Sequence, residues 1–104
     1  MSEENLKDIL ALQKIEEKIF KYKSMYHPNL VANLSREAYD LYLIRNSIGD
    51  QLLEVIKKKG RSLKKIKEFI TEKIHEIETK LKQETIQYEL NLLKISIDEW
   101  KAFL

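Results

Sequence analysis

The cations of this 104-residue chain are concentrated in one short segment. Residues 57–67, with the sequence "KKKGRSLKKIK", contain seven basic side chains and no acidic one, although the net charge of the whole chain is +2. Lysine and arginine neutralise phosphate groups, and the free N–H groups at the start of a helix attract anions. The segment therefore predicts a contact with the phosphate backbone of nucleic acid. The candidate residues are Lys57, Lys58, Lys59, Arg61, Ser62, Lys64, Lys65 and Lys67.

Two other interpretations of this segment stay open. Residues 57–59 suit the negative end of a helix, so a solvent-exposed turn explains half of the charges. It does not explain Lys64, Lys65 and Lys67, which fall in the first turns of the next predicted helix, where the dipole disfavours cations. An acidic protein or an anionic membrane would serve the same charges. No aromatic side chain is interleaved with the cations and no helix-turn-helix pattern is visible, so neither stacking on single strands nor base-specific reading is expected.

The motifs of most catalytic and metal sites are missing from the sequence. It has no cysteine, no HExxH, no glycine-rich phosphate loop and no GxSxG turn. His27 precedes a proline, and His75 lies on a polar helix face beside Glu72 and Glu78, which is typical of a weak exposed pair. We therefore expect a protein that is not an enzyme and that has no cofactor, no metal site and no small-molecule substrate.

Two residues in the stretch "YLIRNSIGDQLL", residues 42–53, have an unusual position in a helix. Arg45 lies on the apolar stripe, four residues after Leu41 and three before Ile48. It is either a side chain whose stem packs while its head reaches water, or the partner of a carboxylate on another helix. A helical glycine costs about 1 kcal/mol relative to alanine, so the close approach of another helix is expected at Gly49. Both residues are predicted to be structural.

The same stretch is similar to the Arg-Asn-x-x-x-His motif of the HEPN domains, a family of small helical ribonucleases. Arg45 and Asn46 match the motif, but Asp50 stands where the family has its catalytic histidine. The resemblance implies RNA cleavage that depends on Arg45, and the missing histidine argues against that activity. A ribonuclease therefore ranks below the two non-catalytic functions considered below.

Long helices have to position these residues. Lys, Glu, Ile and Leu dominate, whereas two glycines and one proline supply too little turn chemistry for an all-β fold. Apolar residues at steps of three and four predict an all-α fold of three long antiparallel helices, arranged up-down-up. They cover about residues 3–26, 34–59 and 62–95, or to 103, within a single domain of residues 1–104. Pro28 and Gly60 end the first two helices, and Ser62 caps the third.

The third predicted helix is longer than its partners. At about 1.5 Å per residue it reaches roughly 50–60 Å, against roughly 35–38 Å for the others. The overshooting end is apolar on two faces, so it either folds back or is covered by a second chain; we favour a second chain, as a homo-oligomer or a partner protein. Ser96 and Glu99 have the spacing of a capping box, so a short fourth helix is possible there. The predicted interface residues are Ile86, Leu90, Leu93, Ile97, Trp100, Phe103 and Leu104.

Two functions from different classes follow from these patterns. The first is a small non-enzymatic accessory protein that contacts nucleic-acid phosphates through the basic segment and assembles through its apolar C-terminal helix. The second is a protein–protein adaptor or assembly subunit with no nucleic-acid contact. The acidic start is no secretory signal and no stretch approaches the roughly 18–20 apolar residues of a membrane span, so a soluble cytoplasmic protein with no membrane contact is expected.

Overall fold

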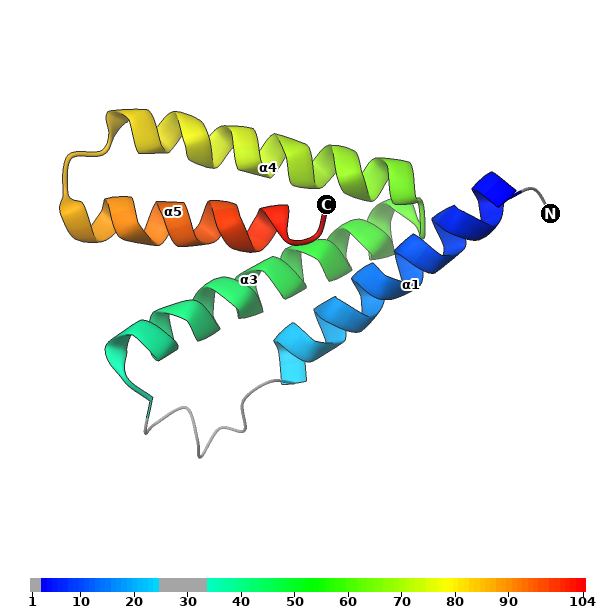
Figure 1. The fold of residues 1–104 in the computed structure, drawn as a ribbon, viewed down its shortest axis with the longest axis horizontal. Helices are drawn as coiled ribbons and strands as arrows, with labels where there is room; N and C mark the ends of the chain where they lie inside the picture. Colours follow the sequence, from blue (N-terminus) through cyan, green and yellow to red (C-terminus); the bar gives the residue numbers. More distant parts are fainter. Residues whose placement is uncertain (1–2, 25–33) are drawn as a thin grey trace.

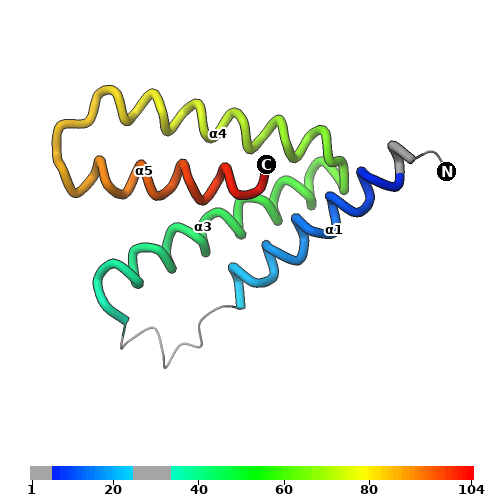
Figure 2. The backbone as a smooth tube through the Cα atoms, in the orientation of Figure 1, coloured from blue at the N-terminus to red at the C-terminus, as the bar shows by residue number. Residues whose placement is uncertain are grey.

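The computed structural model describes residues 3–24 and 34–104, and every secondary-structure element in these ranges is a helix. The helices are α1 (Glu3–Ser24), α3 (Arg36–Lys59), α4 (Leu63–Gln83) and α5 (Gln87–Lys101). The predicted all-α fold is therefore confirmed. Helices α1 and α3 form one antiparallel pair and α4 and α5 a second, with α5 lying between α4 and α3 (Figure 1 and Figure 2). The predicted end of the first helix, at residue 26, lies outside the described residues.

The predicted helix ends between α3 and α4 have the expected local chemistry. Ser35 and Ser62 are the N-caps of α3 and α4, and their hydroxyl oxygens accept from the backbone N–H groups of Ala38 at 3.2 Å and of Lys65 at 3.4 Å. Gly60 follows α3 with a φ of 82°, which is strained for a residue with a side chain, and its N–H donates to the carbonyl of Ile56. Residues 57–67 thus form a tight corner between two helices, which we call the basic turn.

The sequence predicts a third helix that continues to Ile95, but the helix in the structure ends earlier. Helix α4 ends at Gln83, and α5 starts at Gln87 and runs back along it. The turn has neither glycine nor proline; the carboxylate of Glu84 accepts from the N–H groups of Thr85 and Ile86 at 3.1 and 3.0 Å, and two adjacent β-branched residues weaken the helix there. Ser96, the candidate start of a short fourth helix, lies inside α5 instead.

The hydrophobic core draws on all four described helices. Its most deeply buried side chains belong to Ile19 of α1, Ile48 and Leu52 of α3, and Ile66 and Ile70 of α4. Helix α5 and the residues after it add Ile97, Trp100 and Phe103, which are 7%, 3% and 5% exposed. With 21 residues, α4 matches the 22 of α1 and the 24 of α3, so it does not overshoot them. Folding back covers these three side chains within the chain itself.

Gly49 lies where α3 meets α1. A Cβ atom at this position would stand 3.0 Å from Cδ and 3.2 Å from Cγ of Lys23, and 3.8 Å from the carbonyl oxygen of Ile19. The amino group of Lys23 donates to the carboxamide oxygen of Asn46 at 2.9 Å and pairs with the carboxylate of Asp50. The glycine thus leaves room for the stem of Lys23 to cross α3.

Replacing Gly49 with leucine is expected to lower the free energy of unfolding by about 1–3 kcal/mol, because the larger side chain must displace a held neighbour. Urea denaturation measures the change. Gly49→Ala is the control. Its gain of about 1 kcal/mol in helix propensity offsets the cost of a small shift of the Lys23 stem, so its free energy of unfolding should be close to that of the wild type. A leucine variant as stable as the wild type would contradict the tight contact.

Candidate functional site

Most of the predicted phosphate-binding residues lie exposed at the basic turn. Lys57, Lys58 and Lys59 end α3, and Lys64, Lys65 and Lys67 follow in the first turns of α4. The side chains of all six are exposed to solvent. Because the two helices meet at a tight corner, the six amino groups belong to one end of the molecule.

The other two predicted residues of the turn have partners inside the chain. The Arg61 guanidinium donates from Nε and Nη2 to the two carboxylate oxygens of Glu16 on α1, at 3.0 and 2.7 Å. This hydrogen bonding and the charge of Glu16 raise the pKa of Arg61. The Ser62 hydroxyl serves as the N-cap of α4. Arg61 and Ser62 therefore hold the turn in place, and the lysines are the groups that can meet an external anion.

Few acids neutralise these lysines. Lys58 pairs with Glu54 one helical turn earlier, at 3.2 Å. Within the described part of the chain, Lys57, Lys59, Lys64, Lys65 and Lys67 have no carboxylate within salt-bridge distance. The first turn of α4 also contains no acidic residue. The turn is a local excess of positive charge.

A second cationic surface, which the sequence did not predict, lies between α1, α3 and α5. It is a hollow of about 420 Å³ whose basic side chains are Lys14, Lys18, Lys21 and Arg45. Two acids, Glu17 and Glu99, also line it. The three lysines recur on α1 at steps of four and three, which places them on one face of the helix. That spacing was the one sequence signal that could have found the hollow.

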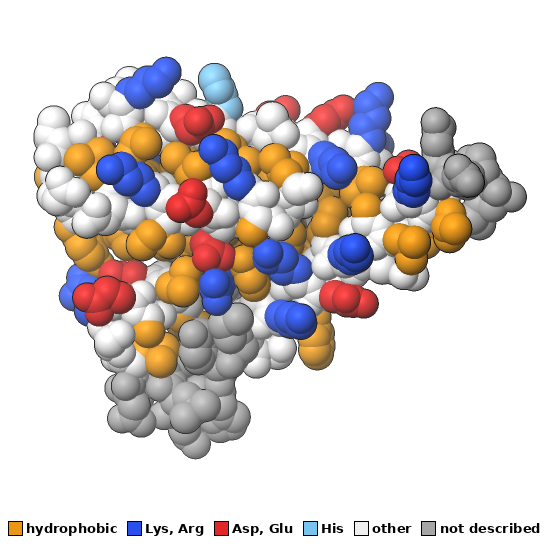
Figure 3. All heavy atoms as spheres, viewed as in Figure 1, with side chains coloured by type: hydrophobic (Ala, Val, Ile, Leu, Met, Phe, Trp, Pro, Cys, Tyr) orange, Lys and Arg blue, Asp and Glu red, His pale blue; other side chains and the backbone are white. Residues whose placement is uncertain are grey.

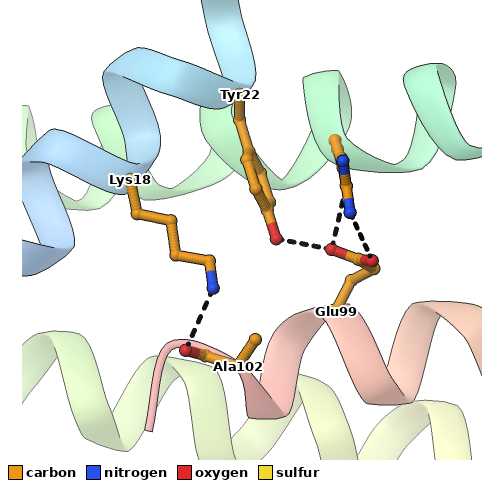
Figure 4. A network of polar contacts seen from close by, with 5 residues as sticks. Lys18, Tyr22, Glu99 and Ala102 are labelled. Atoms are coloured by element: carbon orange, nitrogen blue, oxygen red, sulfur yellow. Dashed lines mark hydrogen bonds and ion pairs between the residues drawn. The ribbon is translucent and has the colours of Figure 1, made fainter. Parts of the chain in front are cut away.

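A polar network at the floor of this hollow joins three helices (Figure 4). Arg45 donates from Nε and Nη2 to the two carboxylate oxygens of Glu99, both at 3.1 Å, and the hydroxyl of Tyr22 donates to Oε2 of Glu99 at 2.5 Å. Beside them, Nζ of Lys18 donates to the carbonyl oxygen of Ala102 at 3.3 Å. The structure thus gives Arg45 a carboxylate on another helix, the second of the two alternatives for this residue.

The network fixes the protonation states of its members. Burial alone would raise the pKa of Glu99, but the hydrogen bonds from Arg45 and Tyr22, with the charges of Arg45 and Lys18, hold the pKa of Glu99 below its ordinary value. Burial, followed by the hydrogen bond to Glu99 and its charge, raises the pKa of Tyr22 well above its ordinary value. At neutral pH, Glu99 is therefore a carboxylate and Tyr22 a neutral phenol, as the observed hydrogen bonds require.

The sequence matches no protein-family model, no curated protein and no solved structure. Function is therefore inferred from the arrangement of the side chains alone.

The stretch with the partial ribonuclease motif makes contacts between helices. Arg45 binds Glu99 of α5, whereas Asn46 and Asp50 both bind Lys23 of α1. Together they connect the middle of α3 to α1 and to α5. These contacts account for the polar residues in the middle of α3.

The predicted interface residues do not form one surface. Ile97, Trp100 and Phe103 are in the core of the chain, and Leu90 and Leu93 are half-buried. Ile86 and Leu104 are 61% and 59% exposed. They lie at opposite ends of α5, since Ile86 precedes the helix and Leu104 follows it. A second chain was expected over these three buried residues because the third helix was predicted to overshoot its partners. In the structure α4 does not overshoot them, so that reason no longer holds.

Residues 3–24 and 34–104 contain neither a cluster of metal-ligating side chains nor a membrane-spanning helix. No group of three or more histidine, aspartate and glutamate side chains there could hold a metal ion. None of the helices described has an apolar stretch that would reach across a bilayer.

Proposed function

We propose that this chain is a small non-enzymatic helical accessory protein that contacts the phosphates of nucleic acid through its basic turn. The observation that carries the proposal is the set of five exposed lysines at one corner of the fold that lack an acidic partner in the described residues: Lys57, Lys59, Lys64, Lys65 and Lys67. Phosphate contacts from such lysines supply most of the sequence-independent affinity for nucleic acid.

The position of the lysines on α4 favours an external anion over a turn that is merely soluble. Lys64 and Lys65 lie in the first turn of α4, where the helix dipole is positive and repels them. No acid in that turn compensates for the repulsion. A phosphate group would be attracted both by the amino groups and by the dipole, so binding would relieve an unfavourable arrangement.

The same geometry argues against reading of bases. The basic turn contains no aromatic side chain on which a base could stack, and its lysines carry point charges without the planar fork of arginine. Arg61, the one arginine of the turn, is engaged with Glu16. Binding is therefore expected to be independent of sequence.

A second candidate is a protein–protein adaptor with no nucleic-acid contact. It is favoured by a hollow of about 380 Å³ between α3, α4 and α5, to which Leu43, Ile77, Leu93 and Trp100 contribute apolar surface. The two candidates are distinguished by binding to random duplex in a salt series. Absence of binding even at low salt would favour the adaptor.

The expected result for the wild type is binding to random duplex that weakens steeply with salt, measured by fluorescence anisotropy. Changing Lys64, Lys65 and Lys67 to glutamate is expected to make the slope of log K against log salt less negative by about 2–3, because each phosphate contact contributes about −0.9 to that slope. The matched control changes Lys82, Lys94 and Lys101 to glutamate; these are also exposed and line a hollow that shares no residue with the turn. Equal loss in both variants would contradict a specific role of the turn.

A further inference from the structure

The basic turn is connected to the lysines of α1 by a hollow that no aspartate or glutamate side chain lines. This hollow of about 220 Å³ lies where α4 and α1 meet the residues after α5. Lys67 enters it from α4, and Lys14 and Lys18 enter it from α1. No aspartate or glutamate lines it. The positive charge of the turn therefore continues onto a different helix.

Shared side chains extend this connection in both directions. Lys67 also lines a hollow along α4 together with Lys64, and Lys14 and Lys18 also line the larger hollow that holds Lys21 and Arg45. The three hollows thus form a continuous path, which we call the cationic track, and its lysines are Lys64, Lys67, Lys14, Lys18 and Lys21. Figure 3 shows basic side chains gathered over α1 on the face drawn there.

The charges of the track are unbalanced in favour of cations. Glu68 and Glu72 lie at its α4 end, and Glu17 and Glu99 lie at its other end. The carboxylate of Glu99 is already occupied by Arg45 and Tyr22. Lys14, Lys21 and Lys67, by contrast, have no acidic partner among residues that the structure describes.

One amino group of the track is held in position by the fold. Nζ of Lys18 donates to the carbonyl oxygen of Ala102 and lies 5.7 Å from the ring centre of Tyr22 and 5.3 Å from that of Phe103. An ammonium with one backbone acceptor retains two further donors. The middle of the track therefore offers a positioned donor, flanked by the amino groups of Lys14 and Lys21.

We propose that the cationic track binds successive phosphate groups of an extended polyanion, with Lys14, Lys18 and Lys21 as phosphate-binding residues beyond the basic turn. The inference deepens the proposed function, which makes this polyanion a nucleic acid. Free polyphosphate has the same chemistry, and the experiment below separates the two sources.

Lys14 and Lys21 are suited to testing the track, because both are exposed and neither has an acidic partner in the described part of the chain. Changing both to glutamine removes the charges and keeps a polar side chain that is somewhat shorter than lysine. The slope of log K against log salt for random duplex is expected to become less negative by about 1.8, since each phosphate contact contributes about −0.9 to that slope. The control changes Lys82 and Lys94 to glutamine; these line a hollow of about 440 Å³ that shares no residue with the track. The control should keep the wild-type slope.

The outcomes separate the two proposals. Suppose that the wild type binds duplex, that the salt dependence of binding becomes weaker in the basic-turn variant, and that it stays unchanged in Lys14→Gln/Lys21→Gln. The track is then overturned and the proposed function stands. If tripolyphosphate binds with a dependence on Lys14 and Lys21 but duplex does not bind, the track stands and the proposed nucleic-acid contact falls. If neither probe binds at low salt, both are overturned. Far-UV circular dichroism confirms in each case that the variant is folded.

Discussion

Replacing Trp100 with alanine is expected to lower the free energy of unfolding by about 3–5 kcal/mol, the cost of removing a large aromatic side chain from a core. Trp100 is 3% exposed, and its ring meets that of Phe69 on α4 edge-on, with centroids 6.0 Å apart. It is the largest side chain that α5 contributes to the core. Urea denaturation followed by circular dichroism measures the change.

This experiment also decides how the apolar stripe of α5 is covered. If α5 folds back within one chain, the loss of stability should not depend on protein concentration, because no association accompanies folding. Ile86→Ala is the matched control, because Ile86 is 61% exposed and its loss should change stability by less than about 0.5 kcal/mol. A small effect of Trp100→Ala, or one that varies with concentration, would favour burial between chains.

Replacing Glu99 with alanine is expected to lower the free energy of unfolding by about 2–3 kcal/mol. The change removes the carboxylate that accepts from the Arg45 guanidinium and the Tyr22 hydroxyl, and the side chains of Arg45 and Glu99 are 24% and 15% exposed. The value lies below that for a fully buried pair, because partial exposure lets water replace some of the lost contacts. A double-mutant cycle with Arg45→Ala measures the coupling between the two residues.

The same network makes stability depend on pH. Because the pKa of Glu99 is lower in the folded chain than its ordinary value of about 4.3, its contribution is present above that value and is lost as the pH falls through the folded pKa. Glutamine cannot titrate, so Glu99→Gln should lose less stability than the wild type on acidification. Glu78→Gln, at an exposed position, is the control and should follow the wild-type profile. A Glu99→Gln variant as acid-sensitive as the wild type would assign the pH dependence to other groups.

The elements that the sequence predicted well are those with local signals. The apolar steps around Ile15 and Ile19, the serine caps and Gly60 all act within a few residues, and the structure has helices and ends at these places. The turn at residues 84–86 carries no such signal, because an ordinary glutamate side chain satisfies its N–H groups. The apparent capping box at Ser96 was misleading, since the carboxylate of Glu99 is used by Arg45 and Tyr22.

In the candidate site, too, the part with a local sequence signal was predicted and the part assembled from distant residues was not. The basic turn is contiguous in the sequence, so composition alone predicted it. The hollow beside Tyr22 combines side chains from α1, α3 and α5, and its position depends on the turn at residues 84–86 that brings Glu99 back to Arg45. A chain with a straight third helix would have placed Glu99 far from both partners. The position of Arg45 on the apolar stripe left open whether its head group reaches water or a carboxylate, and it did not indicate which carboxylate.

The late position of Trp100 and Phe103 in the chain has a consequence for biosynthesis. The helices α1, α3 and α4 leave the ribosome before the side chains that complete their core. Until residues 97–103 emerge, Phe69 and Tyr22 lack the rings of Trp100 and Phe103 that pack against them, so the nascent chain exposes apolar surface that is prone to aggregate. A chaperone that covers apolar helices would shield this surface until the segment has emerged.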